Sequence, residues 1–121
     1  MRIRHKLWLE EDGGLLFGEG RQNLLKAVAE LGSLSAAARK LKMSYRAAWG
    51  RVRASERRLG IKLLQRASTG RSLVLTEAGQ QLLDQYTQFE KEADRAIDKI
   101  GRKIFGSSGR LDLDGDAADR D

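Results

Sequence analysis

Positive charge is concentrated in one segment of this sequence. Residues 39–71 contain eleven Lys or Arg and a single acid, Glu56, so the segment carries a charge of +10. The whole chain carries +6, and residues 107–121 contribute −3 through five Asp against two Arg. Such a density of positive charge is typical of a surface that binds the phosphate backbone of nucleic acid. The other interpretation is a solvated basic face without a partner.

Several side chains in this segment have the chemistry to read the edges of base pairs. The guanidinium groups of Arg46 and Arg53 can each donate two hydrogen bonds, to O6 and N7 of guanine. Tyr45 can donate to a phosphate or touch a thymine methyl group, and Gly50 would let the backbone lie close to DNA. Such contacts require a helix whose N-terminal residues enter the major groove.

Trp49 has two interpretations. It lies three positions from Arg46, which places it at the border of the basic face, and three positions from Val52, which places it at the border of the expected core. A buried tryptophan is the commoner case, because the indole carries a large apolar area. The sequence leaves both interpretations open.

A short helix is expected before these residues. Ser35 can cap a helix of two turns, in which Leu34, Ala38 and Leu41 face inward. The small side chains of its alanine run would let a second helix approach closely. This helix therefore suits the first position of a helix pair.

The second helix of the pair is expected to carry the basic residues. Residues 42–43 form the turn, Ser44 is the N-cap, and the helix runs from Tyr45 to about Leu59, where Gly60 supplies the left-handed stop. The residues expected to face inward are Ala48, Val52 and Leu59. The remaining faces carry five arginines, too much charge to be buried against protein. Two helices joined by so short a turn form a helix-turn-helix.

A β-hairpin is expected directly after this pair. Residues 61–66 and 72–75 are predicted strands that flank a basic loop containing glycine, which is typical of a wing. Arg71 at the tip, together with Lys40 and Lys42, would contact the DNA backbone without reading sequence.

Phosphate contacts are also expected where the first helix of the pair begins. Ser33 and Ser35 can offer hydroxyl and backbone N–H groups to a phosphate, helped by the helix dipole. The candidate DNA-binding residues are therefore Ser33, Ser35, Lys42, Ser44, Tyr45, Arg46, Trp49, Gly50, Arg53 and Arg71.

The N-terminal residues predict a second β-hairpin and a further helix. Residues 3–10 partly alternate apolar with polar side chains, and a Gly-based turn separates them from residues 15–17. From Arg21 the residues Leu24, Leu25, Val28 and Leu31 recur at helical spacing, until Gly32 ends the helix. The pair Gly18 and Gly20 lacks the third glycine and the βαβ unit of a dinucleotide-binding site, so no nucleotide cofactor is expected.

Enzymatic and metal chemistry have little to build on. The sequence contains no cysteine and one histidine, His5, which excludes thiolate sites and gives no partner for a His-based triad or metal cluster. Asp112, Asp114 and Asp116 resemble the start of a calcium loop, but Ala117 stands where that loop needs glycine. No apolar run is long enough for a signal peptide or a membrane span. We expect a soluble cytoplasmic protein that is not an enzyme and has no cofactor or metal.

A long helix, with Thr76 as its expected N-cap, predicts self-association. Its apolar residues follow alternating spacings of four and three, which is a heptad seam: Leu82, Tyr86, Phe89, Ala93, Ala96 and Ile100. The early part, through Leu83, is expected to pack on the same chain, whereas from about Phe89 little of the chain remains to cover the seam. The candidate dimerisation residues are Tyr86, Phe89, Ala93, Ala96 and Ile100.

Several segments resemble known regulators. The segments 32–38 (GSLSAAA), 60–66 (GIKLLQR) and 75–79 (LTEAG) resemble the DNA-binding half of LysR-type winged-helix regulators. The segment 44–49 (SYRAAW) is similar to the Ser-Tyr-Lys/Arg-x-Ala-Trp signature in the N-terminal domain of ModE-type molybdate-dependent regulators. The resemblance covers roughly residues 3–100 and implies operator binding by the helix-turn-helix, with a dimer built by long helices and N-terminal strands.

The resemblance does not extend to a sensor. Full-length regulators of that type carry C-terminal oxyanion-binding modules, whereas a short acidic stretch follows Phe105 here. We therefore expect a stand-alone member without those modules, and no residue is assigned to molybdate or tungstate.

These observations predict a mainly α fold with a small amount of β structure, a winged helix-turn-helix. We expect an N-terminal β-hairpin over residues 1–20, the winged helix-turn-helix over 21–75, a long dimerisation helix over 76–105 and a disordered acidic tail over 106–121. The predicted function is sequence-specific binding of double-stranded DNA by a homodimeric transcriptional regulator at an inverted-repeat operator. The alternative is a protein-interaction adaptor that uses the same scaffold without reading DNA.

Overall fold

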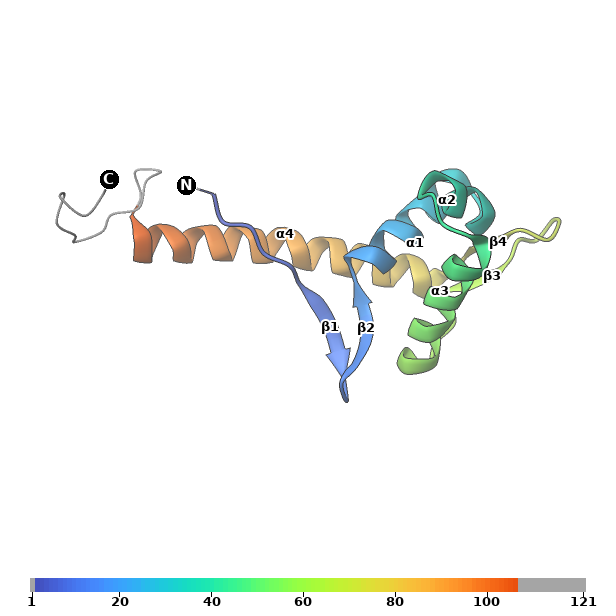
Figure 1. Cartoon of the computed structure of the whole chain (residues 1–121), viewed down its shortest axis with the longest axis horizontal. Coiled ribbons are helices and arrows are strands. Elements are labelled where there is room, and N and C mark those ends of the chain that lie inside the picture. The colour runs from blue at the N-terminus through green and yellow to red at the C-terminus, as the bar shows by residue number, and fades with distance from the viewer. Residues whose placement is uncertain (1, 107–121) are drawn as a thin grey trace. The chain divides into compact units, whose positions relative to one another are not determined.

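The computed structural model describes residues 2–106 and confirms a mainly helical winged helix-turn-helix (Figure 1). The elements follow in the order β1 (Trp8–Glu11), β2 (Gly14–Gly18), α1 (Glu19–Leu31), α2 (Leu34–Lys40), α3 (Tyr45–Leu59), β3 (Leu64–Arg66), β4 (Leu73–Leu75) and α4 (Glu77–Phe105). The chain forms two compact units, Lys6–Gln88 and a smaller one whose described residues are 2–5 and 89–106. The expected acidic tail falls, except for Gly106, outside the described residues.

The N-terminal hairpin forms as expected, although its first strand is shorter. β1 and β2 pair antiparallel, with Asp12 and Gly13 at positive φ (51° and 76°) in the turn between them. β1 begins at Trp8 rather than at residue 3. The register shifts between Leu9 and Glu10, which marks a local irregularity in the ladder.

Helix α1 begins before the expected residue. It starts at Glu19, directly after Gly18 ends β2, and includes Gly20, whereas the spacing of apolar residues predicted a start at Arg21. It ends at Gly32, whose φ of 82° closes the helix as expected. Leu31 was expected on the inner stripe, but it is 45% exposed because it lies in the last turn, beyond the buried residues.

Helix α2 is capped by Ser33, not by Ser35. The Ser33 hydroxyl accepts a hydrogen bond from the Ala36 N–H at 3.1 Å, while the Ser35 side chain is exposed. Leu34 and Ala38 face inward as expected, but Leu41 is 37% exposed. Leu41 follows the last helical turn, so its side chain leaves the stripe that the helical spacing predicted.

The turn and α3 agree with the expectation. Lys42 adopts a left-handed conformation (φ 55°) in the turn, and the Ser44 hydroxyl accepts from the Ala47 N–H at 3.0 Å. Gly60 ends α3 at φ 71°. The inward residues Ala48 and Val52 are fully buried, so α3 packs on the core through one face.

The wing is a shorter hairpin than expected. β3 and β4 pair antiparallel with Leu64 opposite Leu75, and Ile61 lies outside the strand with 42% of its surface exposed. Thr76 then caps α4, because its hydroxyl accepts from the Gly79 N–H at 2.9 Å and donates to the Lys62 carbonyl at 2.6 Å. Thr76 therefore connects the wing to the start of α4.

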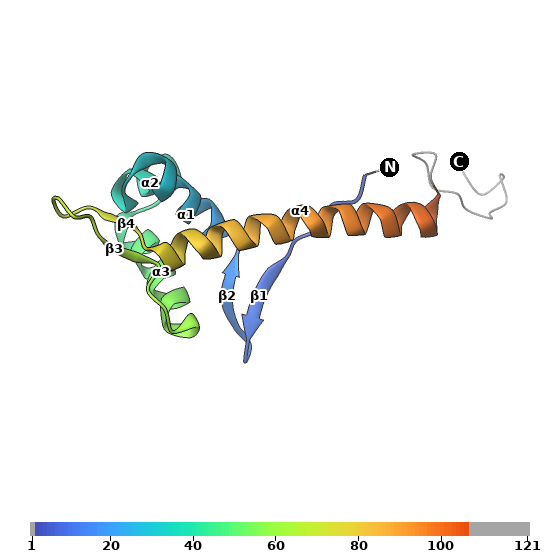
Figure 2. The same cartoon turned by 180° about the vertical axis from the view of Figure 1, so that it is seen from behind.

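The core of the Lys6–Gln88 unit joins α1, α2, α3, β2 and the start of α4. Its largest buried side chains are Phe17, Leu24, Leu25, Leu34, Leu63, Val28 and Val52. The rings of Phe17 and Tyr86 meet edge to face, with centroids 5.1 Å apart. Around this core, α3 lies between the β1–β2 hairpin and the wing: β2 packs on one side, and Glu56 bonds to the start of the wing on the other (Figures 1 and 2).

The smaller unit combines the N-terminal residues with the second part of α4. His5 Nε2 lies 3.1 Å from Asp94 Oδ1, and the Ile3 side chain packs directly on Gly101, where a Cβ atom would collide with it. Within residues 2–106, every helix is too short or too polar to cross a lipid bilayer.

Candidate nucleic-acid interface

The outward face of α3 is basic and open to solvent. Residues 46, 50, 53 and 57 follow one another at spacings of four, three and four, opposite the buried residues Ala48 and Val52. Arg46 and Arg57 are exposed. Tyr45, at the start of the helix, is 48% exposed. The sequence-predicted residues of α3 therefore share a surface that a polyanion could reach.

Trp49 lies outside the core. Its side chain is 43% exposed, and the Arg53 guanidinium carbon lies 5.3 Å from the centre of its ring. This is within the range of a cation–π contact, which holds the two side chains together on the surface. Of the two interpretations of Trp49, the structure favours the exposed one.

The guanidinium group of Arg53 has fewer hydrogen-bond donors available for DNA than expected. Its Nη1 donates to Glu56 Oε1 at 3.0 Å, so part of the guanidinium fork is occupied within the helix. Because the same group also covers Trp49, Arg53 fixes the indole as well as presenting its own charge.

Glu56 is a residue that the sequence reasoning did not select. It is only 6% exposed, and its Oε2 accepts hydrogen bonds from the backbone N–H groups of Leu63 (2.7 Å) and Leu64 (3.1 Å). A buried carboxylate with two backbone donors and one guanidinium is well satisfied. Glu56 therefore fixes the start of the wing to α3. The signal in the sequence was its position as the single acid within the +10 segment.

The residues around α2 that were expected to contact phosphate differ from one another in their surroundings. The Ser33 hydroxyl is used as the helix cap, while Ser35 and Lys42 are exposed. Lys40, expected to help at the wing, instead pairs with Glu30 at 3.3 Å.

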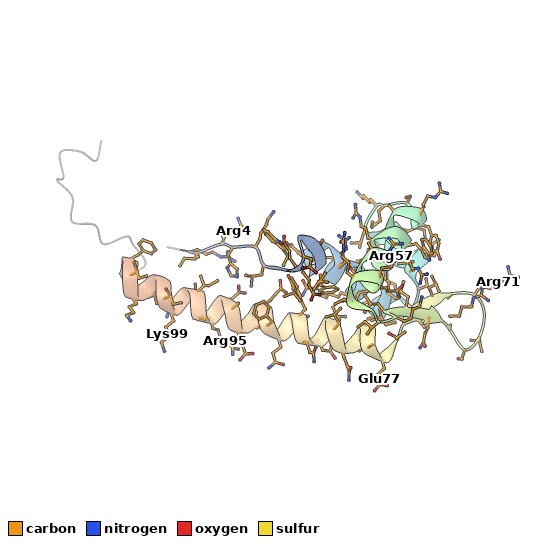
Figure 3. The ribbon with its side chains drawn as sticks, turned by 90° about the horizontal axis from the view of Figure 1, so that it is seen from below. Arg4, Arg57, Arg71, Glu77, Arg95 and Lys99 are labelled. Carbon is orange, nitrogen blue, oxygen red and sulfur yellow. The ribbon has the colours of Figure 1, made fainter. Side chains whose placement is uncertain are left out.

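Gly50 and Arg71 complete the predicted set. A Cβ atom at Gly50 would meet nothing within 4 Å, so the chain itself does not require glycine there. Arg71 is exposed and stands in the loop of the wing, well away from the helices (Figure 3).

The candidate dimerisation residues divide into two groups. Tyr86 is 2% exposed, and its hydroxyl donates to the Leu7 carbonyl at 2.6 Å, so it belongs to the core of its own chain and corrects the expectation. Phe89 and Ile100 are 46% and 54% exposed. Ala96 is exposed and Ala93 half-buried.

Comparison with known proteins places this arrangement in a family. Residues 22–80 match the family described as bacterial regulatory helix-turn-helix protein, lysR family. The molybdenum-pterin-binding protein MopB of Rhodobacter capsulatus is 39% identical over 78% of this chain and 36% of its own length. The molybdenum transport protein ModE of Azotobacter vinelandii is 27% identical over 85% of this chain and 39% of its own length. The chain thus spans somewhat over a third of each curated relative.

A solved structure supports the same assignment. The CbnR_DBD protein, crystallised as a complex with DNA, is 32% identical, with a TM-score of 0.53 over 66% of this chain and 90% of that one. The chain belongs to the lysR family of bacterial regulatory helix-turn-helix proteins.

Proposed function

We propose that this chain is a transcriptional regulator that binds double-stranded DNA through the outward face of α3. The observation that carries the proposal is the exposed basic surface of this helix, with Arg46, Trp49 and Arg57 on one side and the core on the other. Burying these arginines against another protein surface is unfavourable unless that surface supplies opposite charges. The phosphates of DNA supply such charges directly. The DNA complex of the similar CbnR_DBD supports this choice of partner.

Each element has a role in this proposal. The N-terminal half of α3 enters the major groove, where Arg46 can bind guanine with two hydrogen bonds. Trp49, held by Arg53, offers an apolar surface to the bases, and Arg71 on the wing contacts the backbone. Gly50 lets the helix approach closely. The action would take place in the cytoplasm, where a regulator meets DNA.

The proposal includes a homodimer. The second part of α4 exposes Phe89, Ile100 and Ile104, the last with 66% of its surface accessible. These residues continue one seam, and burying them against a second copy would remove a large apolar area from water. Two recognition helices related by a two-fold axis would then meet successive major grooves about 34 Å apart, so the preferred operator is an inverted repeat.

Molybdenum-pterin binding and molybdenum transport, which the names of the two curated relatives state, are not part of the proposal. Their names refer to molybdenum, but the chain spans only somewhat over a third of each of them. We assign no described residue to molybdate. The DNA-binding module is residues 21–75 and the dimerisation helix is residues 76–105.

Fluorescence anisotropy with a labelled duplex of random sequence tests the proposal. The protein should bind the duplex, and log affinity should fall steeply and linearly with log salt concentration, because bound phosphates release counterions. Selection of bound genomic fragments should then yield an inverted repeat. A protein-interaction adaptor would show little binding at any salt concentration, and that result would refute the proposal.

A further inference from the structure

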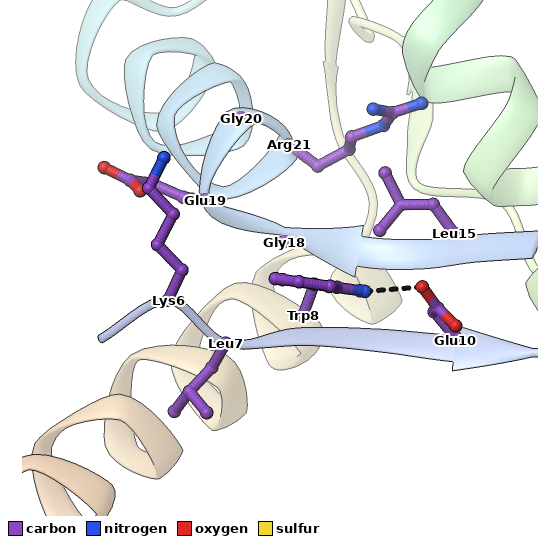
Figure 4. A pocket seen from close by; sticks show the side chains of 9 residues that line it. All are labelled: Lys6, Leu7, Trp8, Glu10, Leu15, Gly18, Glu19, Gly20 and Arg21. Carbon is purple, nitrogen blue, oxygen red and sulfur yellow. Dashed lines mark hydrogen bonds between the residues drawn. The ribbon is translucent and has the colours of Figure 1, made fainter.

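Three arginines lie close enough together for the charges of Arg51 and Arg58 to act on Arg21, and Arg58 contacts the β1–β2 hairpin. Arg21 comes from α1, and Arg51 and Arg58 come from the flank of α3 between its buried and outward faces. The Arg21 side chain extends past Leu15 toward α3 (Figure 4). This group, the arginine cluster, is separate from the outward face that carries Arg46.

The hairpin holds one member of the arginine cluster in place. Arg58 Nη1 donates to the Leu15 carbonyl at 2.8 Å. The Arg58 side chain crosses over Gly14, where an added Cβ atom would come within 2.8 Å of Nε. Gly14 therefore leaves the space that lets Arg58 lie against β2.

The positive charge of the arginine cluster is not neutralised. Burial, and then the charges of Arg51 and Arg58, lower the pKa of Arg21 below its usual value. Arg21 Nε is buried and has no hydrogen-bond partner. Within residues 2–106, none of the three arginines forms an ion pair within 4 Å.

Acidic side chains near the arginine cluster do not change this conclusion. Glu10 and Glu19 line a cavity of about 500 Å³ together with Arg21, and Glu11 and Asp12 line another together with Arg58. All four remain beyond ion-pair distance of the arginines. The nearby acids therefore leave the hydrogen-bonding capacity of the guanidinium groups open to an external ligand.

Arg21 is half-buried and has no counterion among the described residues, an arrangement that destabilises the folded chain, whereas Arg51 and Arg58 are exposed and add positive charge beside it. The arrangement becomes favourable when an anion supplies several acceptor oxygens, and guanidinium groups match the oxygens of phosphate in pairs. We propose that Arg21, Arg51 and Arg58 form a binding site for one phosphate-type oxyanion. The oxyanion is either a backbone phosphate of DNA or a free phosphate ion, and the first source rests on the proposed function.

The free protein provides the first experiment. Arg21→Met removes an unneutralised, partly buried charge, so the melting temperature should stay equal or rise. Inorganic phosphate, titrated against chloride at constant ionic strength, should raise the melting temperature of the wild type if the site takes free phosphate, and should not raise that of Arg21→Met or Arg51→Gln. Lys26→Met, an exposed charge on the same helix as Arg21, should respond as the wild type does.

DNA binding provides the second experiment. If the site takes a backbone phosphate, Arg21→Met and Arg51→Gln should each weaken binding to all sequences alike and reduce the slope of log affinity against log salt by about one. Lys26→Met is again the control, and Arg51→Gln keeps the test valid if Arg21→Met fails to fold.

The outcomes separate this site from the proposed function. A phosphate effect that is lost in the two variants supports the site even if the wild type does not bind DNA. A smaller slope of log affinity against log salt in Arg21→Met and Arg51→Gln, but not in Lys26→Met, supports the site as one that binds a DNA phosphate. The site is refuted by two results together. Both variants bind DNA with the affinity and salt dependence of the wild type, and phosphate changes the melting temperature of the wild type and of the variants equally or not at all. If the wild type binds DNA in that case, the proposed function still stands.

Discussion

Tyr86 and Phe89 lie one helical turn apart on α4, yet their side chains have opposite surroundings. Tyr86 is 2% exposed, packs on Phe17 and donates to the Leu7 carbonyl, whereas Phe89 is 46% exposed. Both belong to the same heptad seam. A seam therefore shows that a helix has an apolar side, but not whether its own chain or a second copy covers that side.

Helix α3 shows the same contrast with charged residues. The Glu56 carboxylate is buried and accepts three hydrogen bonds, whereas Arg46 is exposed. Residues that are satisfied within the chain should control the free energy of unfolding. Exposed residues should instead control association with DNA or with a second copy of the chain. The substitutions below test this division.

Tyr86→Ala should have the largest effect on stability. It removes a buried ring and the hydrogen bond to Leu7, and we expect the free energy of unfolding to fall by about 3–5 kcal/mol. Urea unfolding followed by circular dichroism measures this. The control is Gln85→Ala at the exposed neighbouring position, which should change stability by less than about 0.5 kcal/mol. A small loss for Tyr86→Ala would contradict its place in the core.

The double substitution Phe89→Glu and Ile100→Glu should act on association instead. Both side chains are exposed, so the chain should keep its helix content by circular dichroism. Sedimentation should show a monomer, and affinity for an inverted repeat should fall by about a hundredfold or more, because the second half-site is no longer held at high effective concentration. If this variant still sediments as a dimer with its operator affinity intact, the dimer contact lies outside this seam, and the N-terminal hairpin is the next candidate.

Much of the fold could be predicted because its signals are local. Ser44 and Thr76 as caps, Gly32 and Gly60 as stops, and the spacing of buried residues each depend on a few neighbouring positions. Ser35 was the wrong cap because Ser33 and Ser35 have the same chemistry, and only the position of the first helical turn distinguishes them.

The candidate site was less accessible to sequence reasoning. The outward residues of α3 follow from helical spacing, but the two backbone partners of Glu56 lie seven and eight residues away across a turn. The arginine cluster joins Arg21 to two residues of α3 that lie at least 30 positions later, and the Tyr86 hydroxyl bonds to a carbonyl 79 positions earlier. Only tertiary packing brings such pairs together, so no local pattern shows them.

Glu56→Gln should weaken the connection between α3 and the wing. The amide cannot supply two charged acceptor oxygens to Leu63, Leu64 and Arg53, so we expect a loss of about 1–3 kcal/mol in unfolding free energy. Thermal unfolding measures the loss, and the Trp49 fluorescence should also change because Arg53 is released. An unchanged stability would show that the carboxylate charge is not needed there.

Arg46→Ala should affect DNA recognition without affecting stability. If Arg46 binds guanine through two hydrogen bonds, specific binding should weaken by about 1–3 kcal/mol and base preference should relax at one position of each half-site. Anisotropy titrations with the selected operator and with single-base variants measure both effects. Equal losses on specific and random duplexes would instead place Arg46 on a phosphate.

Arg71→Ala should have the smallest effect and tests the open end of the wing. Arg71 is exposed in the loop between β3 and β4, where its side chain can reach a phosphate but has no fixed partner to hold it at a base edge. Its loss should weaken all sequences alike and reduce the slope of log affinity against log salt by about one, while the melting temperature stays the same. The exposed Lys91→Ala on α4 is the matched loss of one charge. Because net charge falls equally in both variants, a change of slope in Arg71→Ala alone reports a local phosphate contact. The same slope in both variants and the wild type would remove the wing from the interface.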